Sequence, residues 1–370
     1  MSLFLFIIIL VVLILVHEFG HFIVAKRAGI RVDEFSIGFG PTLWSIKRGE
    51  TRYMFKALLL GGYVKIFGEN PNQDSLSGPE SARSFVNQPK LVQTAVITAG
   101  VIFNILLAWV IFSAIFMTGM PTSLSEDEIA SAQNVRLVIA DVLEDTPADR
   151  AGLTAGDVIT GLEKEGGENE TLTTLTGSAF IDYMSAHGTQ PVTLSFTRGD
   201  EEMSVTITPK ENIVPENPDQ SAIGVSLGLV GEQRFAPHIA LWEGARFTYE
   251  MTGLIAVGLF GFFTDIAVGS ADFSQVAGPI GIVSLVGSAA ELGVVSLLLF
   301  TAFISINLAV INILPFPALD GGRLLFIIIE TIKGSPIKPS IANAVNALGF
   351  ILLILLMIVV TYGDILKLGS

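Results

Sequence analysis

The residues best suited to chemistry form the motif His17-Glu18-Phe19-Gly20-His21 near the start of the chain. On a helix, this H-E-x-x-H spacing places both imidazoles on one face, one turn apart. Two neutral imidazoles so placed can bind one zinc ion, and Glu18 can act as the catalytic base toward a water molecule. The pattern therefore indicates a hydrolytic metal site with Zn²⁺ as the cofactor, one ion per chain.

The surroundings of the motif favour that interpretation over a chance match on a soluble helix. Residues 3–16 carry no charge, and the apolar pattern continues through residues 22–24. Ionisable side chains within hydrocarbon are costly unless they have a function. The motif is therefore predicted to lie within a membrane-spanning helix.

A catalytic zinc site needs three protein ligands and an open position, and the best candidate for the third ligand is Asp320. Pro315 and Pro317 break the helix that leaves the apolar run before it, which lets a carboxylate turn inward. An Asp-Gly surface turn is the common alternative. Asn307 and Asn312 precede this turn, where they could hold Asp320 or bind a substrate carbonyl.

Composition and hydropathy place much of the chain in a membrane. The 370 residues are 51% hydrophobic, and none is cysteine, which excludes disulfides and thiolate metal sites. The net charge of −14 argues against nucleic acid as a partner. Residues 26–90 carry 10 Lys/Arg and 6 Asp/Glu, whereas residues 121–250 carry 7 and 22. Because positive loops stay in the cytoplasm, we expect 121–250 on the opposite side of the membrane.

We predict a polytopic α-helical membrane protein with four transmembrane helices, a small β-sheet on the cytoplasmic side and an inserted α+β domain on the outer side. The expected order is a first span at 1–30, a membrane-associated sheet at 31–68, a cytoplasmic loop at 69–90, a second span at 91–120, a linker at 121–134, the α+β domain at 135–210, a linker at 211–234, an amphipathic surface helix with a loop at 235–293, a third span at 294–322, a cytoplasmic loop at 323–345, and a fourth span with the C-terminus at 346–370.

Three features within this plan leave alternatives open. The stretch Leu58–Gly62 is apolar enough to re-enter the membrane beside the zinc, or it is an ordinary cytoplasmic hairpin with a glycine turn. Asn104 in the second span either bonds to another helix or takes part in catalysis. The helix at 235–263 is placed on the outer surface because a further crossing would deliver Asp320 to the side away from the histidines. Both termini are then outside.

Taken in order, the motifs resemble those of the site-2 protease family of intramembrane zinc metalloproteases, in particular its bacterial RseP type. The resemblance covers nearly the whole chain. It is carried by H-E-F-G-H, Gly38-Phe39-Gly40-Pro41, Gly61-Gly62-Tyr63-Val64-Lys65, a PDZ-like module around Thr146–Ile159, Gly278-Pro279-Ile280-Gly281, and an N-x-x-P-x-P-x-L-D-G run that ends at Gly321.

The resemblance implies zinc ligation by His17, His21 and Asp320 and catalysis by Glu18. It implies substrate contacts from Asn312 and its neighbours and from a re-entrant strand containing Leu60, Gly61, Gly62 and Tyr63. The implied partners are the lipid bilayer and single-span substrates such as anti-sigma factors and remnant signal peptides. The implied location is the bacterial inner membrane, with the PDZ-like module periplasmic.

Three departures from the family pattern stand out: a single PDZ-like signature, Val101 where many relatives have proline, and Arg323 where some have histidine. The single signature puts gating by paired PDZ domains in doubt.

Two other functions compete with proteolysis. A membrane zinc transporter would need polar residues along a whole path, whereas a non-catalytic PDZ scaffold would be indifferent to changes at Glu18 and His21.

Overall fold

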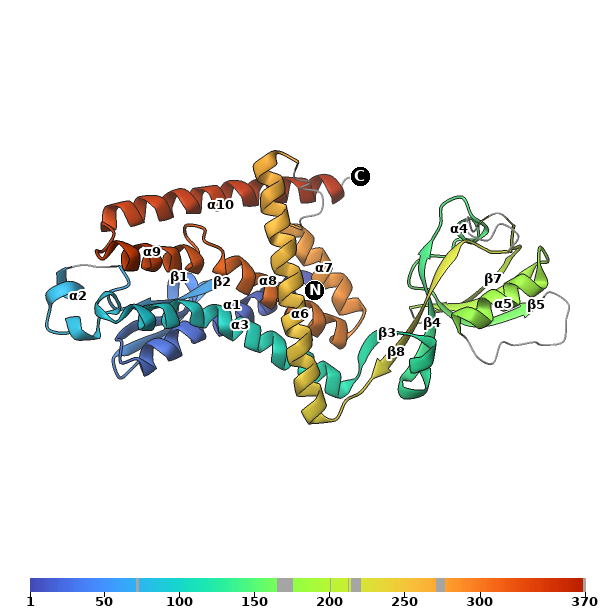
Figure 1. The fold of residues 1–370 in the computed structure, drawn as a ribbon, viewed down its shortest axis with the longest axis horizontal. Coiled ribbons are helices and arrows are strands. Elements are labelled where there is room, and N and C mark those ends of the chain that lie inside the picture. The colour runs from blue at the N-terminus through green and yellow to red at the C-terminus, as the bar shows by residue number, and fades with distance from the viewer. Residues whose placement is uncertain are drawn as a thin grey trace. The chain divides into compact units, whose positions relative to one another are not determined.

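The computed structural model describes residues 1–70, 73–164, 176–199, 201–211, 213, 221–270 and 277–368. The chain forms two compact units, one made of Met1–Ile115 with Pro237–Ser370, and the other of Phe116–Ala236 (Figure 1). The second unit is thus an insertion in the first, as the sequence predicts for the acidic segment.

The first unit is built mainly from long apolar helices. Four of them correspond to the predicted spans: α1 (Ser2–Arg27), α3 (Lys90–Thr118), α8 (Val294–Ile313) and α10 (Pro339–Leu368). With α6 (Pro237–Val268), five helices among the described residues are long and apolar enough to cross a membrane. Lys26 and Arg27 end α1, where positive charge is favourable to the helix dipole.

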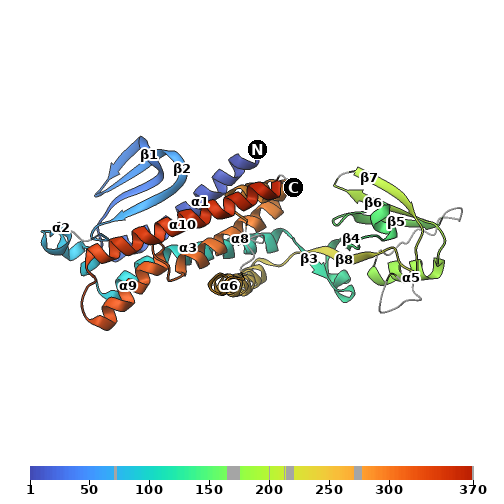
Figure 2. The same cartoon turned by 90° about the horizontal axis from the view of Figure 1, so that it is seen from above.

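Helix α6 is the one that the sequence places on the membrane surface. In Figure 1 it stands upright across the direction of α3 and α10, and in Figure 2 it is seen end-on while those helices lie in the plane. It contacts the C-terminal half of α3, where Phe112 and Phe247 pack edge to face and the Trp109 indole donates a hydrogen bond to the Leu241 carbonyl. Much of its apolar surface, including Leu254 and Val257, is exposed.

Two helices of this unit lie where loops are expected from the sequence. Helix α7 (Pro279–Glu291) starts with proline in its first turn, a position that tolerates it. The backbone N–H groups of Gly278 and Gly281 donate to the buried carboxylate of Asp364 in α10. Helix α9 (Asp320–Lys333) ends at a left-handed glycine, Gly334. Helix α9 therefore covers the first part of the predicted loop 323–345, and α10 covers the last part of that loop, from Pro339 onward.

The predicted sheet at 31–68 consists of two long strands, β1 (Val32–Arg48) and β2 (Thr51–Ile66), in four paired segments. Residues 34–37 of β1 contact two separate segments of β2, residues 52–55 and residues 62–65. Residues 42–48 pair with 51–56 around a turn at Gly49. The next segment, 69–90, holds only three short helical turns among its described residues: α2 (Gln73–Ser77), η1 (Ser81–Arg83) and η2 (Phe85–Asn87).

A buried apolar cluster fixes the sheet against the helices. It joins the end of α1, both strands, α3 and α9, and its members are Ala25, Ile30, Val32, Val64, Ile66, Phe85, Val96, Ile97 and Ile327. Burying each large aliphatic side chain contributes roughly 1.5–3 kcal/mol. The cluster therefore holds chain segments that are distant in sequence around the end of α1 that carries the H-E-x-x-H motif.

The second unit contains a six-stranded sheet in the order β3-β8-β4-β5-β6-β7, and each pair of neighbouring strands is antiparallel. The strands are β3 (Met120–Leu124), β4 (Gln133–Val142), β5 (Val158–Lys164), β6 (Val192–Arg198), β7 (Glu201–Ile207) and β8 (Val225–Gln233). The turns and helices are η3 (Glu126–Ser131), α4 (Pro147–Arg150) and α5 (Gly177–His187).

The limits predicted for this domain, 135–210, are too narrow. Segments 121–134 and 211–234, expected to be linkers, supply β3 and β8, and β8 pairs with both β3 and β4. The glycines and polar residues in these segments interrupt the apolar alternation that predicts a strand, so the strands are not evident from the sequence. Gly231 lies in β8 where an added Cβ would come within 2.5 Å of Leu124, so a residue that weakens a strand signal is here required by packing.

An ion pair anchors the middle of the second unit. The Asp157 side chain is 1% exposed and accepts hydrogen bonds from the Arg198 guanidinium at 2.7 and 2.8 Å and from the Thr154 backbone N–H at 2.9 Å. Burial raises the pKa of the Asp157 carboxyl, but the hydrogen bonds from Arg198 and Thr154 outweigh burial, so its pKa lies below the usual value. The ionised form is therefore the one the fold stabilises.

Removing the cation should loosen this unit. Arg198→Met leaves a buried carboxylate without its partner, so we expect several-fold faster hydrogen exchange in β5 and β6, measured on the full chain by mass spectrometry. Arg150→Met, at an exposed position of α4, is the control. Because the folded pKa of Asp157 is depressed, its contribution is complete above the unfolded pKa of about 3.9 and is lost as the pH falls through the folded value. Unchanged exchange in Arg198→Met would mean that the ion pair does not anchor the sheet.

Candidate metal centre

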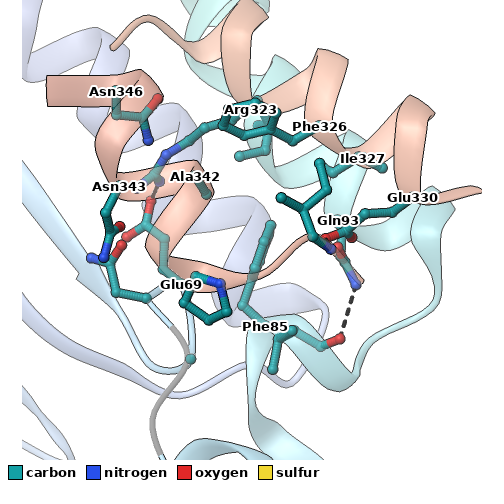
Figure 3. Close-up of a pocket in the computed structure, with 16 residues that line it drawn as sticks. Glu69, Phe85, Gln93, Arg323, Phe326, Ile327, Glu330, Ala342, Asn343 and Asn346 are labelled. Carbon is teal, nitrogen blue, oxygen red and sulfur yellow. Dashed lines mark hydrogen bonds and ion pairs between the residues drawn. The ribbon is translucent and has the colours of Figure 1, made fainter. Parts of the chain in front are cut away.

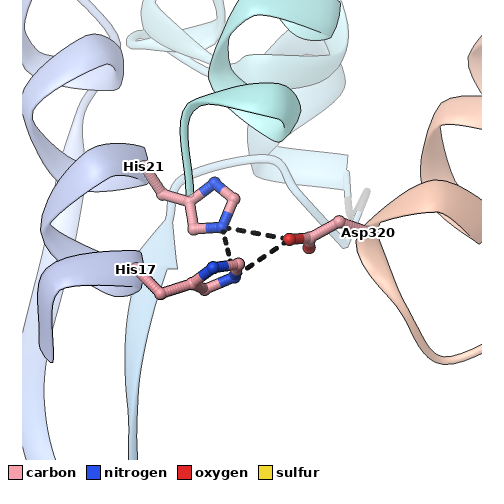
Figure 4. Close-up of side chains that lie close together, drawn as sticks. All are labelled: His17, His21 and Asp320. Atoms are coloured by element: carbon pink, nitrogen blue, oxygen red, sulfur yellow. Dashed lines mark hydrogen bonds and ion pairs between the residues drawn. The ribbon is translucent and has the colours of Figure 1, made fainter. Parts of the chain in front are cut away.

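Three side chains from the two ends of the chain meet at one point (Figure 4). The Oδ2 atom of Asp320 lies 3.0 Å from His17 Nε2 and 3.3 Å from His21 Nε2, and the two Nε2 atoms are 3.2 Å apart. Both histidines are buried, at 8% exposure. The structure therefore brings together the three ligands that the sequence predicts, one turn apart on α1 and at the start of α9.

The chemistry of these donors fits a bound cation. The Nδ1 atom of His21 lies 2.8 Å from the Val96 carbonyl, which can only accept, so Nδ1 carries a proton and Nε2 of a neutral ring presents a lone pair. That lone pair faces Asp320 Oδ2, a buried atom to which no hydrogen bond is donated among the described residues. Acceptors so close repel one another unless a cation lies between them, as in a His₂-carboxylate zinc site.

Helix α3 leaves room for the cation because it presents glycine at this level. A Cβ added to Gly100 would come within 2.4 Å of His21 Nε2 and 2.8 Å of His17 Nε2. A Cβ on Gly20 would meet the Ala99 carbonyl at 2.5 Å, so α1 and α3 touch backbone to backbone. Such close approach at small residues is typical of helices packed in membranes.

The loop that delivers Asp320 is held by the glycines that follow it and by α10. Added Cβ atoms would lie 2.0 Å from the Leu314 carbonyl at Gly321 and 2.3 Å from the Phe316 carbonyl at Gly322, which explains why two glycines follow the aspartate. The Asn346 side chain of α10 accepts a hydrogen bond from the Ala318 backbone N–H at 3.3 Å. The break in the helix is thus fixed in one conformation.

The proposed base, Glu18, lies between the metal ligands and the β-sheet. Its carboxylate receives the backbone N–H of Val64, and its Cγ would be 3.7 Å from a Cβ added to Gly62. Glu18 also lines a cavity of about 200 Å³ together with the three ligands, Tyr63 and Val64. The base and the metal ligands therefore face the same space, as hydrolysis by an activated water requires.

A second cavity, of about 140 Å³, lies beside the first. Glu69 and Ile97 line both. Glu69 forms an ion pair with Arg323, which lies one turn after Asp320 on α9, and polar side chains including Gln93, Asn343 and Asn346 surround them (Figure 3). The metal centre is therefore adjoined by a partly polar space that α3, α9, α10 and residues 68–70 and 85–86 border.

The residues predicted to contact substrate divide into two groups. Gly61, Gly62 and Tyr63 lie in β2 next to Glu18, and the Tyr63 hydroxyl donates to Glu34 at 2.8 Å. Leu60 belongs to the same strand, but its side chain lies outside the described set. Asn307 and Asn312 line neither cavity of the centre, and the Asn307 amide donates to the Phe303 carbonyl of its own helix. Within the part of the chain that the structure describes, no hydrogen bond joins either asparagine to Asp320, and contact with a substrate carbonyl stays a prediction.

The sequence singles out Asn104 on α3 but gives no indication that Val96 and Gly100 belong to this centre. Val96, Gly100 and Asn104 lie at intervals of four residues and form one face of that helix toward the histidines. The Asn104 amide lies 3.4 Å from His17 Nδ1. The four-residue spacing can be read from the sequence. The roles of the Val96 carbonyl and of the space over Gly100 cannot, because neither depends on a functional side chain.

Known proteins that resemble this chain include zinc metalloproteases. Residues 5–356 match the model of Peptidase family M50. A putative zinc metalloprotease of Clostridium perfringens is 36% identical over 355 residues, covering 96% of this chain and 95% of its own. The zinc metalloprotease RasP of Geobacillus kaustophilus is 30% identical over 439 residues, covering 98% and 97%. A Listeria monocytogenes PDZ domain of an SdrC-like protein covers 25% of this chain at 25% identity, but its TM-score of 0.20 does not define a fold.

A set of apolar helices that encloses a His-His-Asp cluster with a neighbouring glutamate defines a membrane metalloprotease. The chain belongs to Peptidase family M50, the site-2 protease family, which its match over nearly the whole length establishes.

The space over Gly100 provides a direct test of the metal centre. Gly100→Ala places a methyl group against both Nε2 atoms, so we expect the purified protein to lose bound zinc, measured by elemental analysis after dialysis. Gly258→Ala, in α6 where a Cβ meets nothing within 4 Å, should keep its zinc. Full zinc occupancy in Gly100→Ala would mean that the cation lies elsewhere.

Proposed function

We propose that this chain is an intramembrane zinc endopeptidase that hydrolyses peptide bonds within the transmembrane segments of single-span proteins, using one zinc ion per chain. The observation that carries the proposal is the convergence of His17, His21 and Asp320 beside Glu18, within helices suited to a bilayer. Anti-sigma factors and remnant signal peptides are the substrate classes implied by the family resemblance.

In this proposal the three ligands hold the cation and Glu18 moves the proton. Bound zinc supplies Lewis-acid chemistry, which acidifies water and polarises a carbonyl group. Glu18 accepts a proton from the attacking water as the new C–O bond forms at the scissile carbonyl carbon. It then gives that proton to the amide nitrogen as the C–N bond breaks, so the products are a carboxylic acid and an amine.

The sheet supplies a means to present the peptide. A helical substrate keeps its carbonyls in internal hydrogen bonds, so it must be unwound before attack. Residues 62–65 of β2 pair with β1 on one side, and Gly62 carries no side chain between this strand and Glu18. Strand addition to this edge would hold the substrate extended next to the base.

The route of water follows from the adjoining polar cavity. Hydrolysis consumes one water per bond, and water is scarce within hydrocarbon. Glu69 lines both the metal cavity and the space that contains Arg323, Asn343 and Asn346. In the proposed topology this space opens on the cytoplasmic side, so we assign it as the water supply of the centre.

The second unit offers a site for a different kind of contact. An apolar cavity of about 280 Å³ lies between α5 and residues 221–227. Val225 and Leu227 pair with β4, and β3 joins β8 only from Leu229 onward, so the strand edge beside this cavity is open among the described residues. We propose that this PDZ-like module takes an extended peptide there, either as a reader of newly cut C-termini or as a size filter.

The proposed topology is that of an inner-membrane protein of bacteria. Residues 26–90 face the cytoplasm, the acidic second unit is periplasmic, and both termini are outside. Helix α6 lies on the outer surface, in keeping with its course across α3 and α10 (Figures 1 and 2). The third of the four spans, α8, then brings the start of α9 back to the cytoplasmic depth of His17 and His21.

The role of Glu18 is tested by Glu18→Gln, which keeps the size of the side chain but removes the base. We expect peptide cleavage to fall by at least about 100-fold while zinc stays bound. The measurement is product mass after incubation of purified protein with a panel of single-span peptides, with zinc content determined in parallel. Glu291→Gln, at the end of α7, is the matched control and should cleave normally. Full activity in Glu18→Gln would refute the mechanism.

The position of α6 is tested by labelling of single cysteines, which is unambiguous because the chain has none of its own. Cysteine at Gly269, directly after α6, should react in intact spheroplasts with a reagent that cannot cross membranes. Cysteine at Gly49, in the turn between β1 and β2, should react only after lysis. Protection of the 269 position until lysis would mean that α6 crosses the membrane and that the four-span topology is wrong.

A further inference from the structure

The environment of His17 differs from that of His21 at the ring nitrogen away from Asp320. His21 Nδ1 faces the Val96 carbonyl. His17 Nδ1 instead faces the amide group of Asn104, at 3.4 Å from its nitrogen. His21 therefore has a backbone acceptor that no substitution removes, whereas the hydrogen bonding of His17 Nδ1 depends on the side chain of Asn104.

The hydrogen bonding of Asn104 is incomplete in this orientation. Its side chain is fully buried, and its amide oxygen has no partner among the described residues. A histidine that offers Nε2 to a metal carries its proton on Nδ1, so the Asn104 amide N–H would face another N–H. Turning the amide by half a turn exchanges its two atoms, which gives the oxygen a donor and His17 Nδ1 an acceptor.

The backbone of Asn104 is held independently of this side chain. The Ser305 hydroxyl, in α8, donates to the Asn104 carbonyl at 2.8 Å. This hydrogen bond joins α3 to the helix that leads to Asp320. Because it uses a backbone carbonyl, it persists whatever side chain stands at position 104, so packing of the helices and orientation of His17 can be separated by mutation.

We infer that Asn104 is a positioning residue of the metal centre: its amide oxygen accepts the Nδ1 proton of His17 and thereby fixes the ring as an Nε2 zinc ligand. The inference rests on the proposed function, since it needs the ion. Partners of this kind hold the ring orientation and raise the basicity of the ligating nitrogen, and their loss typically weakens metal binding by about 10- to 100-fold.

The test compares Asn104→Leu with Asn104→Asp in the purified full-length protein. Leucine keeps the approximate size and removes the acceptor, whereas aspartate keeps an acceptor oxygen. We expect Zn²⁺ affinity, measured by competition with a chromogenic chelator, to fall about 10- to 100-fold in Asn104→Leu and to stay within a few-fold in Asn104→Asp. The visible absorption of Co²⁺ at the site should change in the leucine variant alone.

Ser113→Ala is the control for disturbance of α3, because Ser113 is a buried polar residue of the same helix outside the metal cavity. It should bind zinc like the wild type. Wild-type affinity in Asn104→Leu, or an equal loss in both Asn104 variants, would overturn the inference. If the wild type itself binds no zinc while remaining folded, the proposed function fails and this inference fails with it.

Discussion

The structure depends on the close contact between α1 and α3. Gly20 meets the Ala99 backbone and Gly100 lies against both imidazoles, so the two helices approach to a distance at which no side chain fits between them. That approach places the Val96 carbonyl within hydrogen-bonding distance of His21 and the Asn104 amide beside His17. A metal site inside a membrane protein is thereby formed by helix packing, since an imidazole cannot rely on water to orient it.

The remaining elements bring one group each to this pair of helices. The apolar cluster around Val64 and Val96 fixes the sheet, so that Gly62 and the Val64 N–H lie beside Glu18. The proline turn and its glycines bring Asp320 from the other end of the chain. The sheet and the proline turn therefore each supply a group that neither α1 nor α3 offers.

Much of the site could be predicted from residue types. His17, Glu18 and His21 follow a spacing with a known chemical meaning, and Asp320 is indicated by the two prolines before it, which break the helix and let a carboxylate turn inward. What could not be predicted depends on geometry that residue types do not record. A backbone carbonyl such as that of Val96 is present in every residue, and the importance of Gly100 lies in an atom it lacks. Asn307 and Asn312 were attractive because they are polar and near Asp320 in sequence, yet neither lines the cavities around it.

For the fold, too, some elements can be predicted from residue types and others cannot. Uniform apolar runs predict the long helices, and the inserted unit of strands and short helices lies in the acidic segment where it is expected. Helices α7 and α9 were missed because proline and glycine at their ends suggested loops, although proline is compatible with a first turn and glycine with a helix end. Strand β8 was missed because its glycines weaken a local signal that pairing with two neighbouring strands outweighs.

The carboxylate of Asp364 has a consequence for the whole helical unit. It holds the first turn of α7, and α7 packs against α1 as well as α10. Helices α1 and α10 are therefore connected through α7, although almost the entire chain separates them in sequence. Loss of the Asp364 hydrogen bonds would weaken the packing on one side of α1, the helix that carries both imidazoles. Residues far from the metal centre therefore help to maintain the geometry of its cavity.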